Sequence, residues 1–131
     1  MLDRIDLHVE VTPVNFNELS SERPAEKSEL IRARVIAARD IQLERFGARP
    51  ELHANAQMSP QMVRDICKID VAGQTLLKRA MEKLGLSARA YDRILKVART
   101  IADLAASEDI KLEHLAEAIH FRSLDREGWA G

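Results

Sequence analysis

The sequence contains few of the residues that most strongly restrict what a protein can be. Its single cysteine, Cys67, cannot form a disulfide within the chain, so a reducing compartment is expected. No apolar run approaches the roughly 20 residues that a membrane helix requires. The first six residues, 1–6, carry charges where a secretion signal would need an apolar stretch. We therefore expect a cytoplasmic protein without membrane contact.

Glycine is scarce, and neither sign of charge dominates. None of the five glycines has the spacing of a G-x-x-x-x-G-K-[ST] or G-x-G-x-x-G phosphate loop. A lone cysteine cannot supply a pair of zinc thiolates, and no G-x-S-x-G elbow presents a serine nucleophile. The 20 Lys and Arg balance 21 Asp and Glu, which argues against bulk electrostatic binding of nucleic acid or membrane.

The first eleven residues have the pattern of a strand. Apolar side chains alternate with polar ones, at the period of a strand with one buried face. The apolar positions are Ile5, Leu7, Val9 and Val11. Nothing later in the chain is a convincing second strand, and one strand cannot form a sheet. The segment therefore indicates a strand whose partners lie elsewhere in a larger protein, followed by a connector over residues 12–25.

The remainder predicts an all-α bundle of four to five helices. Residues 26–46 form an amphipathic helix that Gly47 ends as a left-handed C-terminal cap. Its inward side recurs near a 3.6-residue period and consists of Leu30, Ile31, Val35, Ala38, Ile41 and Gln42. Three further helices begin after Ser59, Asp70 and Ser87, the second of them ending at Gly85, and a fifth spans about 112–122. The predicted organisation is residual strand and flexible linker at 1–25, helical domain at 26–124 and flexible tail at 125–131.

The helix that follows Ser87 carries a basic stripe opposite its apolar sector. The stripe consists of Arg89, Arg93, Lys96 and Arg99. Arg89 in the first turn could contact a phosphate, because a helix N-terminus carries partial positive charge and free N–H groups. The alternative is an ordinary solvated face, since Asp92 and Asp103 stand four residues from Lys96 and Arg99 and predict surface ion pairs.

Arg4 and a group on the last helix raise similar questions. Arg4 at the start of the strand could reach a neighbouring subunit's phosphate, or it could simply be solvated. Glu117 and His120 have the i, i+3 spacing of carboxylate-bridged metal sites, but such sites need the pair twice and only one copy is present. We therefore expect no metal site, and we expect Cys67 to be a small packing residue.

Four segments together resemble a known family. They are Leu2–Leu7 (LDRIDL), Asn55–Ser59 (NAQMS), Leu84–Leu104 (LGLSARAYDRILKVARTIADL) and His114–Ile119 (HLAEAI). They resemble the C-terminal part of the magnesium chelatase-like AAA+ ATPases, and most closely the bacterial YifB/ComM group. The resemblance runs over nearly the whole chain and is most specific between Leu84 and Leu104.

The resemblance implies a helical lid that closes over ATP and Mg²⁺ bound against the αβ core, in a ring whose subunits share each site. It maps the sensor-2 arginine onto Arg89 and the arginine finger, acting on the neighbouring subunit, onto Arg4, with a weaker ATP-binding claim for Arg93. The partners implied are the core of the same protein, the neighbouring subunits and, because ComM-type members are linked to DNA processing in natural transformation, DNA.

The chain departs from the family pattern by lacking the Walker A, Walker B and sensor-1 segments. We therefore expect no ATP hydrolysis and no bound cofactor for this chain alone. The alternative function is a stand-alone helical adaptor that binds DNA or protein through the basic stripe.

Overall fold

The computed structural model describes residues 7, 27–47 and 51–122, and every regular element in these ranges is a helix. In chain order the elements are α2 (Ser28–Arg45), the 3₁₀ turn η2 (Asn55–Gln57), α3 (Pro60–Ile66), α4 (Val71–Leu84), α5 (Ala88–Leu104) and α6 (Leu112–His120). The predicted all-α class is confirmed. Arg4, the rest of the predicted strand other than Leu7, the connector before residue 27 and the tail 125–131 lie outside the described residues.

The predicted helix starts are confirmed at the level of single hydrogen bonds. Ser59 Oγ accepts from the Met62 N–H at 3.3 Å, Asp70 Oδ1 from the Gly73 N–H at 2.7 Å, and Ser87 Oγ from the Ala90 N–H at 3.2 Å. Each bond satisfies a backbone donor that the first turn leaves without a helical partner. Gly85 ends α4 in the left-handed conformation, with φ 62°.

The predicted cap at Gly47 is wrong. The helix α2 ends at Arg45, and its C-cap is Phe46 with φ −104°. The Phe46 N–H donates to the Gln42 carbonyl at 3.0 Å, while its side chain is buried in the core. Because Phe46 closes the last turn and enters the core, no left-handed residue is needed, and Gly85 is the one glycine with positive φ in the described chain.

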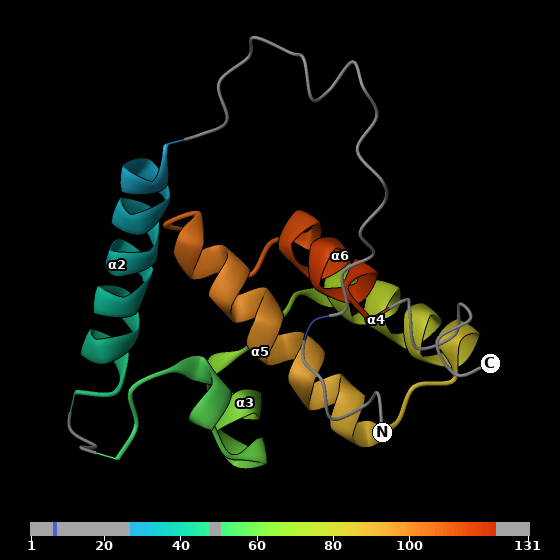
Figure 1. Ribbon diagram of the computed structural model, residues 1–131. Helices are drawn as coiled ribbons and strands as arrows, with labels where there is room; N and C mark the ends of the chain where they lie inside the picture. The colour runs from blue at the N-terminus through green and yellow to red at the C-terminus, as the bar shows by residue number, and fades with distance from the viewer. Residues whose placement is uncertain (1–6, 8–26, 48–50, 123–131) are drawn as a thin grey trace, which may run out of the picture.

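The core surrounds α5, which crosses the middle of the fold in Figure 1, with α2 on one side and α4 and α6 on the other. Small alanines on the buried side of α5 allow its neighbours to approach closely, and Ile94 and Leu95 fill the space between them. The packing role predicted for Cys67 is confirmed, since its side chain lies in this core. No helix within the described ranges is both long and apolar enough to cross a membrane.

The predicted apolar side of α2 is largely uncovered. Leu30, Ile31 and Val35 are exposed, and the buried residues of this helix are Ala38 and Gln42, further along the chain. The predicted inward side is therefore confirmed at Ala38 and Gln42 and wrong at Leu30, Ile31 and Val35. The physical reason is that α2 meets α5 through its C-terminal half, so its first turns have no described helix against them.

Candidate functional site

Arg89 lies in the first turn of α5 and is exposed to solvent. Ser87 holds the start of this helix by accepting from the Ala90 N–H, so the turn that carries Arg89 is fixed. An exposed guanidinium at the positive end of a 17-residue helix dipole can bind a phosphate group that approaches from outside. The predicted position of Arg89 therefore has a geometry suited to an anionic ligand.

The other cations of the predicted stripe are less available. Arg93 is partly buried, and Lys96 donates from Nζ to the Ala56 carbonyl at 3.2 Å. This bond ties the middle of α5 to η2, which lies 40 residues earlier in the chain. The exposure of the stripe decreases along the helix from Arg89 toward its C-terminus.

Arg99 is buried, with 5% of its surface exposed. Its Nη1 donates to the Glu108 carbonyl at 2.8 Å and its Nη2 to the Ser107 carbonyl at 2.6 Å, both in the loop before α6. Its Nε donates to Asp103 Oδ1 at 3.2 Å. The predicted surface ion pair of Arg99 and Asp103 therefore exists as a buried pair, because both side chains turn toward partners that sequence spacing does not show.

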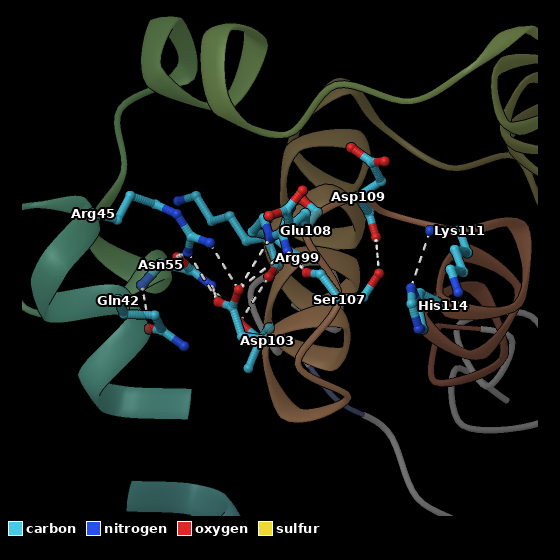
Figure 2. A network of polar contacts seen from close by, with 12 residues as sticks. Gln42, Arg45, Asn55, Arg99, Asp103, Ser107, Glu108, Asp109, Lys111 and His114 are labelled. Atoms are coloured by element: carbon cyan, nitrogen blue, oxygen red, sulfur yellow. Dashed lines mark hydrogen bonds and ion pairs between the residues drawn. The ribbon is translucent and has the colours of Figure 1, made fainter. Parts of the chain in front are cut away.

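Asp103 is the centre of a buried polar network (Figure 2). Its two carboxylate oxygens accept from Arg45 Nη1 and Nη2 at 2.9 and 2.7 Å, a two-pronged pair between α2 and α5. Asn55 Nδ2 donates to the same carboxylate at 2.9 Å. Two arginines and one amide thus surround a carboxylate that is itself 2% exposed.

Asn55 connects the remaining members of the network. Its N–H donates to Gln42 Oε1 at 2.9 Å, its Oδ1 accepts from Arg45 Nη1 at 2.9 Å, and its Nδ2 donates to Thr100 Oγ1 at 3.0 Å. Because Asn55 is almost fully buried, these bonds replace its contacts with water. The network therefore locks α2, η2 and α5 together at the end of α5 opposite Arg89.

The ionisation of the network follows from these contacts. Burial alone would raise the pKa of Asp103, but hydrogen bonds from Arg45 and Asn55, together with the charges of Arg45 and Arg99, outweigh it and lower that pKa below its usual range. The hydrogen bond to Asp103 raises the pKa of Arg45. Asp103 is therefore a carboxylate and Arg45 is a cation at neutral pH. Nearby, burial raises the pKa of the Cys67 thiol to about 11, so it is a poor nucleophile.

A hollow of about 290 Å³ lies between α3, the start of α4 and α5. It is bordered by Arg64, Lys68 and the Tyr91 ring, two residues beyond Arg89. Sequence analysis did not identify these residues. The described residues contain no group of three or more His, Cys, Asp or Glu side chains able to hold a metal ion.

Sequence analysis also missed Arg45, Asn55 and Gln42 as a set. One signal was available, since Gln42 falls on the inward side of the predicted first helix, where a polar residue must have a buried partner. Its partner Asn55 lies in the NAQMS segment. Periodicity cannot reveal that Arg45 and Asp103, 58 residues apart, meet.

Comparison with known proteins places this geometry in a family. The family described as "Magnesium chelatase, subunit ChlI C-terminal" matches residues 25–122. The chain is 41% identical over 127 residues to Competence protein ComM of Haemophilus influenzae, a match that covers 95% of this chain and 24% of that protein. It is 39% identical over 126 residues to the uncharacterized protein YifB of Escherichia coli, with the same coverage.

A more distant relative is the uncharacterized protein Rv2897c of Mycobacterium tuberculosis, 32% identical over 123 residues, or 93% of this chain and 24% of that protein. The chain spans about a quarter of the length of the curated relatives that it matches. The predicted resemblance is thereby confirmed over most of the helical domain. The chain belongs to the family of the magnesium chelatase ChlI C-terminal domain and corresponds to the C-terminal quarter of ComM and YifB.

Proposed function

We propose that this chain is the helical lid of a magnesium chelatase-like AAA+ ATPase, which helps to bind ATP and couples its hydrolysis to motion of a ring. Family membership supports this proposal, and one feature of the structure carries it. Arg89 is exposed at the positive end of α5, while the other end of the same helix is locked to α2 and η2. A helix fixed at one end can hold a cation in a defined place at the other.

The chain's own residues fit a phosphate ligand at this point. The Arg89 guanidinium is a permanent cation and can donate two parallel hydrogen bonds to phosphate oxygens. ATP with Mg²⁺, held by the longer protein, supplies the phosphoanhydride bond that is cleaved. Arg89 orients and neutralises the terminal phosphate, and the α5 N-terminus adds its dipole. Arg93, one turn further on and partly buried, has a weaker part in the same site.

Arg4 enters the proposal from sequence alone. In the ring we assign to it the arginine finger that reaches the ATP of the neighbouring subunit and stabilises charge developing during phosphoryl transfer. The partners are then the αβ core of the same protein and the adjacent subunits. The name of the relative ComM refers to competence. We include DNA as the substrate of the motor, and the cytoplasm as its location, in the proposal.

Turnover by the longer protein that contains this segment tests the role of Arg89. Arg89→Ala should lower the rate of ATP hydrolysis or the affinity for ATP by about 10- to 100-fold, since a hydrogen bond to a charged group contributes about 1.5–3 kcal/mol. Arg79→Ala is the matched control, because Arg79 is an exposed arginine on α4. Equal turnover and affinity in the two variants would refute the assignment.

The alternative is an adaptor that binds DNA through the basic stripe. The structure argues against this adaptor function, because Arg99 is buried among protein partners and Lys96 donates a hydrogen bond to the Ala56 carbonyl. If the 131-residue chain nevertheless binds duplex DNA with an affinity that falls steeply with salt, the adaptor gains support. Binding that is absent at physiological salt leaves the lid as the better assignment.

A further inference from the structure

An apolar groove of about 390 Å³ runs along α5 on the side that faces the end of α6. Val97, Ile101 and Leu104 of α5 form its floor, and Phe121, directly after α6, forms one wall. Lys96 and Glu117 stand among its few polar neighbours. A hollow of this size is larger than one side chain needs, and its chemistry suits an apolar occupant.

Leu7 lies in this groove. It is the one described residue ahead of position 27, and it borders the groove together with residues of α5. Ninety residues separate it from Val97, so the contact is not a consequence of chain connectivity. About half of the Leu7 surface, 49%, is exposed, and the other half is covered.

The residues around Leu7 supply more of the same chemistry. In an extended chain, side chains two residues apart point to the same side, about 6.5–7 Å from one another. Ile5 and Val9 stand two residues before and after Leu7 in the sequence, the spacing at which strand side chains share one side. The groove is lined mostly by apolar side chains, which suits a row of this kind.

We propose that the α5–α6 groove is the docking site for the apolar side of the N-terminal segment, with Leu7 as its anchor. Docking through side chains leaves the backbone edges of the segment available for pairing in a sheet. In the lid proposed above, the same contact would join the last strand of the core to the helix that carries Arg89. That extension rests on the proposed function, whereas the contact within this chain does not.

The 131-residue chain itself provides the test, by methyl NMR and thermal unfolding. NOEs are expected from the Leu7 methyl groups to protons of Ile101, Leu104 or Phe121. Leu7→Ala should lower the Tm by about 4 °C, because it removes roughly half of a leucine's burial. Val71→Ala is the control, since Val71 on α4 is 78% exposed and does not border the groove, and its Tm should change by less than about 1 °C.

Two outcomes would overturn the proposal. Absence of these NOEs, with equally small Tm changes in Leu7→Ala and Val71→Ala, would show that the groove does not hold the segment. NOEs that arise only between differently labelled molecules, with a Tm that depends on concentration, would show that a second copy fills it instead. A loss of ATP turnover in Arg89→Ala bears on neither outcome, so the two proposals can fail separately.

Discussion

The two ends of α5 carry the same residue type in opposite environments. At the N-terminal end Arg89 is exposed, and its first turn is held by one cap from Ser87. At the C-terminal end Arg99 is 5% exposed and donates to one carboxylate and two backbone carbonyls. The helix therefore has one end that can meet a ligand and one end that is committed to the fold.

The difference shows how position on a helix decides what an arginine does. Arg99 must satisfy its donors within the protein, because burying an unpaired cation costs several kcal/mol. Arg89 keeps its donors hydrated and can exchange water for a phosphate at small cost. A rigid C-terminal end benefits the N-terminal end, since a guanidinium on a fixed helix loses less conformational freedom when it binds.

The comparison predicts its largest effect at Asp103. Asp103→Ala removes the carboxylate that accepts hydrogen bonds from both Arg45 and Arg99, so these two arginines lose their shared buried acceptor. The free energy of unfolding should fall by about 3–5 kcal/mol, the usual cost of breaking a buried pair from one side. Urea unfolding of this chain measures it. Asp40→Ala, at an exposed position of α2, is the control and should change it by less than about 0.5 kcal/mol.

Capping chemistry explains why much of this fold was predictable and the network was not. Ser59, Asp70, Ser87 and Gly85 act within four residues of themselves, so sequence spacing reveals them. Asp103 and Arg45 meet only because α2 packs across α5, which no local pattern encodes. The same limit made Arg99 look like a member of a solvated face, whereas Arg89 was placed correctly as an exposed first-turn residue, since helix spacing alone decides that position.

The second prediction compares the two arginines directly. Arg99→Ala should lower the free energy of unfolding by about 2 kcal/mol, because Asp103 and the Ser107 and Glu108 carbonyls lose charged donors. Arg89→Ala should change it by less than about 0.5 kcal/mol, as for other exposed positions. Urea titrations of both variants, side by side, provide the measurement. Equal losses would contradict the division of α5 into a binding end and a structural end.

Acidification should lower the free energy of unfolding through the Asp103 network at the C-terminal end of α5. The loss should be smaller than in Asp103→Ala or Arg99→Ala. The pKa of Asp103 is lowered in the folded protein, so its contribution to stability is complete above the unfolded value of about 3.9 and is lost as the pH falls below it toward the folded value. The effect is smaller because a protonated Asp103 still fills its place and can accept hydrogen bonds from Asn55 and the arginines.

Urea midpoints between pH 6 and pH 3 test this, with Asp103→Asn as the variant that lacks the titrating group. The variant should be less stable at pH 6 and should lose less stability on acidification than the unmodified chain. If the urea midpoints of the two proteins fall equally with pH, other carboxylates control acid unfolding and Asp103 does not.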